Sequence, residues 1–120
     1  MERRHLTTFN IAGFSYYDGP VVFHELGIGT ELTLQHEPDN RYDPKAVLIL
    51  YGEYKLGYIP RGPNNSISKF LEMGHNPFEV RIQRIDPAAH PEEQIGVIVY
   101  IRKNKSAVSS GKKKKKVKMQ

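Results

Sequence analysis

The stretch AVLILY at residues 46–51, followed by Gly52-Glu53 and by YKLGYI at residues 54–59, decides the fold. Six consecutive apolar side chains, aliphatic and β-branched, are typical of a strand that is buried on both faces. A glycine-containing pair between two such runs favours a hairpin turn. These residues therefore predict two antiparallel strands joined by a hairpin turn.

Further strands are expected on both sides of this hairpin. Residues 7–14 and 31–36 precede it, and Leu32 and Leu34 alternate with polar residues as in a half-buried strand. Residues 77–85 and 94–101 follow it. The alternation in the first of these two stretches breaks near Arg84, as at a bulge or at a misplaced strand boundary.

Only one stretch has helical spacing. Ile67, Phe70 and Leu71 would share one helix face, and Gly74 follows as a C-terminal stop. The N-cap is expected from one of three polar residues, Asn64, Asn65 and Ser66. About six strands with one short helix, at about residues 64–74, predict a mainly β fold, a small OB-like or SH3-like β-barrel.

Charge divides the chain into two parts. Residues 102–120 carry nine Lys and Arg and no acid, which leaves nine basic and 13 acidic residues, a net charge of −4, in residues 1–101. A net acidic domain does not suit a broad clamp on duplex DNA, whose affinity comes from many phosphate contacts. We therefore expect a β-barrel domain at residues 1–103 and a disordered basic tail at residues 104–120.

Several classes of protein are disfavoured. The chain has no cysteine, no apolar run that approaches a membrane span and no hydrophobic signal core. It also lacks the G-x-x-x-x-G-K-[ST] motif that binds the phosphates of ATP. Its histidines and acids have no recognised metal-ligand spacing. We expect neither an enzyme nor a metal or cofactor site, and no membrane partner. The expected location is intracellular: cytoplasm or nucleoid in a bacterium, nucleus in a eukaryote.

Three motifs stand in order along the chain: G-x-x-Y-Y-x-G at residues 13–19, E-P-x-N-x-Y-D-x-x-A-V at residues 37–47, and G-Y-I-P at residues 57–60. Together they resemble the HIRAN domain family, over about residues 9–101. The resemblance implies an OB-type barrel that binds single-stranded DNA at its 3′ end by reading the terminal hydroxyl. It also implies a free-standing module related to the N-terminal domains of Rad5-type helicases.

The resemblance also assigns roles to site residues. It places six side chains at the pocket: Tyr16, Tyr17, Tyr42, Asp43, Tyr58 and Arg61. One tyrosine of the first pair would stack on the terminal base, Asp43 would accept a hydrogen bond from the 3′-hydroxyl, and Arg61 would contact a backbone phosphate. Each residue type suits its role, since rings stack on bases, a carboxylate accepts a hydroxyl proton, and a guanidinium grips phosphate.

Other interpretations stay open at this point. The tyrosines could be packing residues, Asp43 could form a local Asx turn, and Arg61 could be a solvated charge. Ser15 stands where the DNA-binding family member has a basic residue. The alternative function is therefore a protein-interaction or scaffold barrel without a DNA pocket. Nucleic-acid affinity would then reside only in the tail lysines Lys112, Lys113, Lys114, Lys115 and Lys116.

The expected partner is single-stranded DNA, with RNA as the alternative ligand, because stacking pockets tolerate either sugar. DNA repair or replication proteins are the expected protein partners. The sequence leaves the oligomeric state undetermined.

Overall fold

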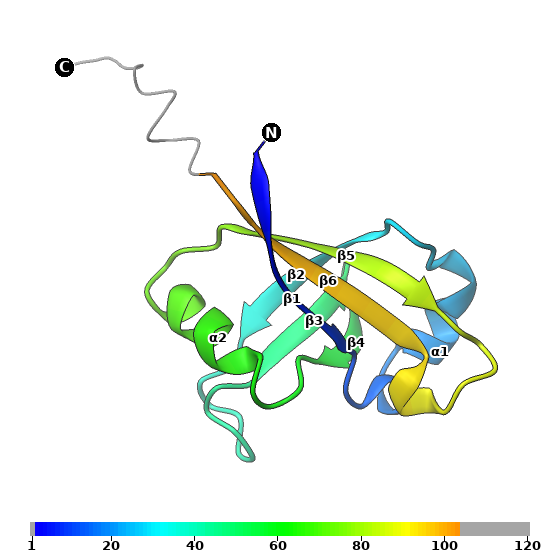
Figure 1. The fold of residues 1–120 in the computed structure, drawn as a ribbon. Helices are drawn as coiled ribbons and strands as arrows, with labels where there is room; N and C mark the ends of the chain where they lie inside the picture. The colour runs from blue at the N-terminus through cyan, green and yellow to red at the C-terminus, as the bar shows by residue number, and fades with distance from the viewer. Residues whose placement is uncertain (1, 104–120) are drawn as a thin grey trace.

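The computed structural model describes residues 2–103 (Figure 1). The predicted basic tail at residues 104–120, with its lysine run at residues 112–116, lies outside the described residues.

Six antiparallel strands form one sheet, in the order β1-β6-β5-β2-β3-β4. The strands are β1 (Arg3–Asn10), β2 (Glu31–His36), β3 (Val47–Tyr51), β4 (Tyr54–Tyr58), β5 (Phe78–Ile85) and β6 (Ile95–Arg102). The sheet is not closed into a continuous barrel. A short bridge between Ala12 and Tyr58 nevertheless joins the segment after β1 to β4 at the opposite edge. The prediction of a mainly β, six-stranded, OB-like fold is confirmed.

The β3–β4 hairpin and the strands next to it supply much of the core. Residues 46–49 are buried, as the apolar run predicts, and Leu32 and Leu34 of β2 point inward with them. β5 and β6 pair over their whole length, with a register shift between Ile82 and Arg84. The break in alternation is therefore a bulge and not a misplaced boundary. β1 begins and ends four residues earlier than the stretch at residues 7–14 that the sequence indicated.

The predicted helix is α2 (Asn64–Glu72). It ends as expected at Gly74, whose φ is +85°, with N–H groups of Gly74 and His75 donating to the carbonyls of Leu71 and Phe70. Its start differs from the prediction, because Pro63 occupies the N-cap position and no side chain caps the helix. The side chain of Asn64 is engaged elsewhere, as described below.

Four shorter helical segments accompany α2. They are η1 (Phe14–Tyr16), α1 (Gly19–Val22), η2 (Phe23–Glu25) and η3 (Pro91–Glu93). Each has three or four residues, which is too short for a hydrophobic period to appear in the sequence. The tyrosine pair of the first motif lies at the end of η1 and directly after it.

The contact between the two sheet edges depends on Gly57. Its φ is +141°, and a Cβ there would lie 2.4 Å from the carbonyl oxygen of Ala12. That carbonyl accepts the Tyr58 N–H at 2.9 Å, while the Ala12 N–H donates to the Tyr58 carbonyl at 2.9 Å. Only glycine allows this approach and this backbone conformation together.

We therefore expect Gly57→Ala to lower the free energy of unfolding by at least about 2 kcal/mol, since it combines backbone strain with a clash. Gly52→Ala is the matched control, because Gly52 also has a positive φ but nothing lies within 4 Å of its Cβ position. Urea unfolding of both variants measures the difference. Equal losses of stability would show that the edge contact contributes nothing.

Candidate functional site

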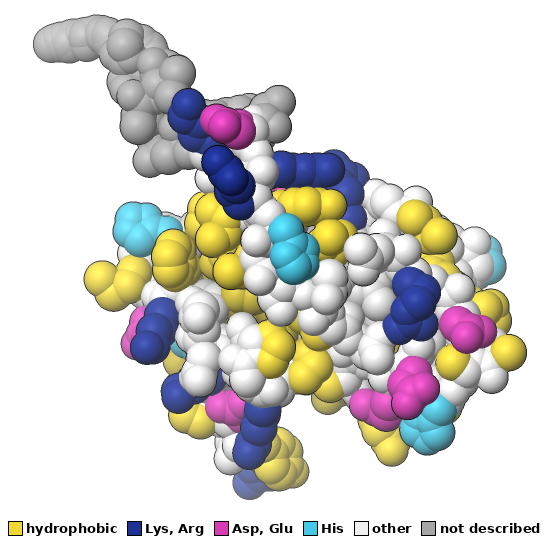
Figure 2. All heavy atoms as spheres, in the orientation of Figure 1, with side chains coloured by type: hydrophobic (Ala, Val, Ile, Leu, Met, Phe, Trp, Pro, Cys, Tyr) yellow, Lys and Arg dark blue, Asp and Glu magenta, His cyan; other side chains and the backbone are white. Residues whose placement is uncertain are grey.

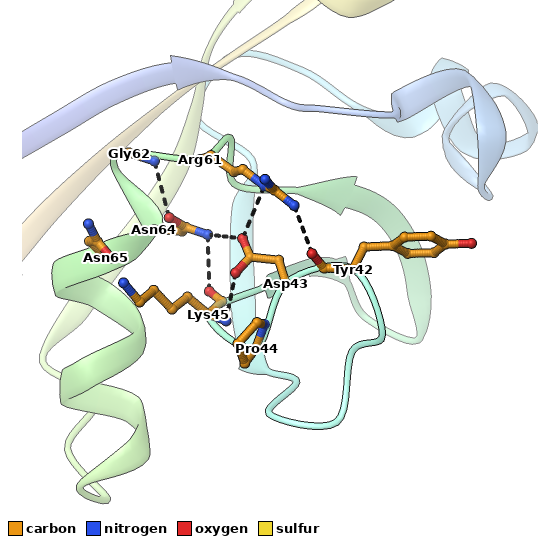
Figure 3. Close-up of a pocket in the computed structure, with 8 residues that line it drawn as sticks. All are labelled: Tyr42, Asp43, Pro44, Lys45, Arg61, Gly62, Asn64 and Asn65. Atoms are coloured by element: carbon orange, nitrogen blue, oxygen red, sulfur yellow. Dashed lines mark hydrogen bonds and ion pairs between the residues drawn. The ribbon is translucent and has the colours of Figure 1, made fainter.

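A pocket of about 410 Å³ opens between the β2–β3 loop and the residues that precede α2 (Figure 3). Its size falls in the range of about 300–1,000 Å³ that is typical of small-ligand sites. The residues that line it are Tyr42, Asp43, Pro44, Lys45, Arg61, Gly62, Asn64 and Asn65. Three of the six predicted site residues, Tyr42, Asp43 and Arg61, therefore share one pocket.

Asn40 gives the β2–β3 loop its shape. Its Oδ1 accepts the N–H groups of Tyr42 at 2.9 Å and Asp43 at 3.1 Å, and its Nδ2 donates to Glu37 Oε1 at 3.2 Å. An asparagine side chain of this kind replaces a backbone turn. The spacing E-P-x-N-x-Y-D is thus the spacing of a side-chain-stabilised loop that presents Tyr42 and Asp43 together.

Asp43 is held by contacts to both of its oxygens. Oδ1 accepts the Lys45 N–H at 2.9 Å, and Oδ2 accepts Asn64 Nδ2 at 3.0 Å and lies 3.6 Å from Arg61 Nε. The Lys45 N–H, with Asn64 and the nearby Arg61 charge, lowers the pKa of Asp43 below its usual value, although partial burial opposes the shift. The side chain is still 20% exposed. Each oxygen has two lone-pair sites, so the ionised carboxylate can accept a further hydrogen bond.

Positive charge faces this carboxylate. The Arg61 side chain is 75% exposed, and its Nη2 donates to the Tyr42 carbonyl at 2.7 Å. Lys45 lines the same pocket from the end of the loop, as Figure 3 shows. The pocket can therefore receive a hydroxyl donor at Asp43 and an anion at Arg61 and Lys45.

Asn64 connects the pocket to the helix. It is only 3% exposed, and its Nδ2 donates to both Asp43 Oδ2 and the Lys45 carbonyl, at 3.0 and 3.1 Å. Its Oδ1 accepts the Gly62 N–H at 3.2 Å. Sequence reasoning treated Asn64 as a helix cap and did not include Asn64 or Lys45 in the site. No local pattern signals a contact between residues 19 to 21 positions apart.

The tyrosines divide into two kinds. Tyr16 and Tyr42 are 81% and 79% exposed, so their rings are available to stack on a ligand. Tyr17 and Tyr58 instead pack edge to face, with ring centroids 5.7 Å apart. The Tyr58 hydroxyl donates to Glu37 Oε1 at 2.7 Å, and burial together with this bond raises the pKa of Tyr58. Tyr16, Tyr17 and Tyr58 are not among the residues that line the pocket.

Residues 2–103 contain neither a candidate metal-binding cluster nor a membrane-spanning helix. No three His, Asp or Glu side chains in this part of the chain are grouped so that they could hold a metal ion. No helix in the same residues is long and apolar enough to cross a membrane.

We expect Asn64→Ala to raise the pKa of Asp43 toward its ordinary value, because the variant removes a donor from the ionised carboxylate. Carboxyl-carbon NMR of the folded protein measures this titration directly. Asn65→Ala is the control, since Asn65 lines the same pocket but does not contribute to the depressed pKa of Asp43. An unchanged titration of Asp43 in the Asn64 variant would contradict the assigned contact.

The lowered pKa of Asp43 makes the stability of the fold depend on pH. Asp43 is more acidic in the folded than in the unfolded state, so it stabilises the fold at pH values above the usual carboxyl range. This stabilisation is lost as the pH falls through the pKa of the folded state.

Comparisons with known proteins agree with this fold. A family model described as the HIRAN domain matches residues 5–104. A crystal structure of a protein from Lactobacillus plantarum is similar with a TM-score of 0.71 and 22% identity, over 83% of this chain and 95% of that one. The crystal structure of the HIRAN domain of human HLTF is similar with a TM-score of 0.59 and 16% identity, over 89% of this chain and 84% of that one.

No curated protein sequence matches the chain. The two structural likenesses, at such low identities, support the fold alone, whereas the family model spans nearly all of the described residues. The chain belongs to the HIRAN domain family, which is a family of DNA-binding modules.

Proposed function

We propose that this chain binds single-stranded DNA and holds the free 3′ end of the strand in the pocket beside Asp43 and Arg61. One observation carries the proposal: an ionised carboxylate and two cationic side chains line a single open pocket with room for a small ligand such as a nucleotide. A strand end carries the same two features, a hydroxyl that donates and a phosphate that is negative.

Asp43 would distinguish a strand end from an internal position. A free 3′-hydroxyl can donate a charge-assisted hydrogen bond to the carboxylate, whereas a 3′-phosphate would be repelled by it. Asp43 is suited to this role because its lowered pKa keeps it ionised. Its partners hold the side chain in one orientation, so little conformational entropy is lost when a ligand binds.

Arg61 and Lys45 would contact the phosphate that precedes the terminal nucleotide. The Arg61 guanidinium uses one Nη2 proton on the Tyr42 carbonyl and places Nε near Asp43, so other N–H groups are available to an anion. The same bond fixes the backbone of Tyr42. An exposed ring on a fixed backbone is a suitable platform for the terminal base.

Tyr16 and Tyr17 belong to the proposal in different ways. Tyr16 offers a second exposed ring on η1, while Tyr17 packs against Tyr58, whose hydroxyl holds Glu37 at the start of the pocket loop. Stacking is tolerant of sequence, so we expect little base preference. Such a module would serve repair or replication complexes, in which free 3′ ends occur.

The end-reading role is tested with a short single strand that carries either a 3′-hydroxyl or a 3′-phosphate. We expect the hydroxyl form to bind the full chain more tightly, by roughly tenfold for one charge-assisted hydrogen bond. Asp43→Asn should narrow the difference, because the amide neither repels phosphate nor accepts as strongly. Fluorescence anisotropy gives both affinities. Equal binding of the two strands by the unmodified protein would refute the proposed selectivity.

The stacking role is tested separately. Tyr42→Ala should weaken the binding of both strands by about 1–3 kcal/mol, because one base–ring contact is lost. The preference for the 3′-hydroxyl strand should remain. Tyr54→Ala is the control, because Tyr54 is also an exposed tyrosine but does not line the pocket. Isothermal titration calorimetry measures the affinity of each variant for the two strands.

The alternative function, a scaffold barrel with nucleic-acid affinity only in the basic tail, gives a different result. Strand affinity would then be the same in the Asp43, Tyr42 and Tyr54 variants. Competition between ribo- and deoxyribo-oligonucleotides of the same sequence shows whether the protein prefers RNA or DNA as its ligand.

A further inference from the structure

We infer a second nucleic-acid contact, for the phosphate backbone, at the paired ends of β1 and β6. The terminal basic surface, as we name it, consists of Arg3, Arg4 and Lys103. The inference rests on the proposed function in one respect: the strand it contacts is the one whose end occupies the pocket beside Asp43.

The sheet brings these three cations together from the two ends of the described chain. In the β1–β6 pair, Arg3 lies opposite Arg102 and Arg4 opposite Ile101. The Lys103 N–H then donates to the Glu2 carbonyl at 3.1 Å. As a result, Arg3, Arg4 and Lys103 line one depression of about 270 Å³, together with Glu2 and Ile101.

The terminal basic surface lies away from the pocket. In Figure 1 the ends of β1 and β6 are at the top of the molecule, and the β2–β3 loop is at the bottom. Figure 2 shows dark blue Lys and Arg side chains gathered at that upper end. A strand held at its end by the pocket would therefore meet this surface only along its length.

The surface keeps a positive charge after its ion pairs are counted. Glu79 is shared between Arg3 and Arg81, Arg81 also approaches Glu31 at 4.0 Å, and Lys103 lies 3.5 Å from Glu2. The three cations of the terminal basic surface thus have two carboxylate partners, Glu79 and Glu2, a net charge of +1. The rest of residues 2–103 has eight basic and 11 acidic residues, a net charge of −3.

This contrast argues for a polyanion and against a neutral partner. A DNA strand would be repelled by most of the domain surface and attracted to this end of it. Among the described residues Arg4 forms no ion pair, and its side chain is exposed. It is available to a phosphate without breaking another contact.

Arg3 is held in place before any ligand arrives. Its guanidinium lies 3.8 Å from the centroid of the Tyr100 ring and pairs with Glu79. An arginine that is stacked and paired in this way loses little freedom when it contacts phosphate. The surface therefore has one fixed cation, Arg3, beside the unpaired Arg4.

The experiment uses the full chain and two single strands with 3′-hydroxyl ends. One has about three nucleotides and the other about 20, longer than the roughly 4–16 nucleotides that an OB fold covers. Affinities are measured over a series of salt concentrations. For a single strand, each phosphate contact contributes about 0.7 to the slope of log K against log salt.

The double variant Arg3→Ala/Arg4→Ala should lower this slope by about 1.4 for the long strand and leave the affinity for the short strand unchanged. Arg3→Lys/Arg4→Lys retains the charges and should retain the slope. Lys55→Ala/Lys69→Ala is the matched control, because it removes two exposed charges from β4 and α2. All variants keep the lysines that follow Lys103, so a difference between them reports the folded surface.

The inference is overturned if the long-strand slope is the same in the Arg3/Arg4→Ala variant and the unmodified chain. It is equally overturned if the Lys55/Lys69 control loses as much slope, which would indicate a general charge effect. A failure of the proposed pocket looks different: the unmodified chain would show no 3′-hydroxyl preference, while the slope would still fall only in the arginine-to-alanine variant.

Discussion

The residues between β2 and β3 form no regular secondary structure, and side chains satisfy much of their backbone. The Asn40 side chain accepts hydrogen bonds from the N–H groups of Tyr42 and Asp43. The Asp43 carboxylate accepts one from the Lys45 N–H, and the Asn64 amide donates one to the Lys45 carbonyl. Without these bonds a polar loop of this length would occupy many conformations, and a ligand would have to order it at a cost of about 1–2 kcal/mol per residue. The pocket exists because the loop is already ordered.

The same constraint links the three sequence motifs. Tyr17 of the first motif packs against Tyr58 of the third motif. The Tyr58 hydroxyl in turn donates a hydrogen bond to Glu37, the first residue of the second motif. The bridge between Ala12 and Tyr58 makes this possible, and it requires a glycine at position 57. Motifs that are far apart in the chain thus form one connected unit.

Much of the fold could be predicted because its signals are local. The hairpin at residues 46–59, the bulge near Arg84 and the helix stop at Gly74 each depend on a few neighbouring residues. The bounds of β1 were displaced because its first residues are charged and exposed, so they carry no alternation. The cap of α2 was misassigned because the Asn64 side chain turns to Asp43, a contact that only tertiary structure creates.

The site was predictable in part for the same reason. A family resemblance located Tyr42, Asp43 and Arg61, but the burial of the Tyr58 hydroxyl and the presence of Lys45 in the pocket depend on packing. The two interpretations of Asp43, a turn residue and a ligand contact, are compatible in the structure. One oxygen forms the turn with Lys45, and the other faces Arg61 beside the open pocket.

The most direct test of the central claim is to map the bound strand end on the protein. Backbone amide resonances would be followed by NMR while a DNA strand of about three nucleotides, shorter than an OB-fold site, is added to the full chain. The account predicts that the largest shifts fall on Tyr42, Asp43, Lys45 and Arg61. Shifts confined to other parts of the molecule, with these four amides unmoved at saturation, would contradict it.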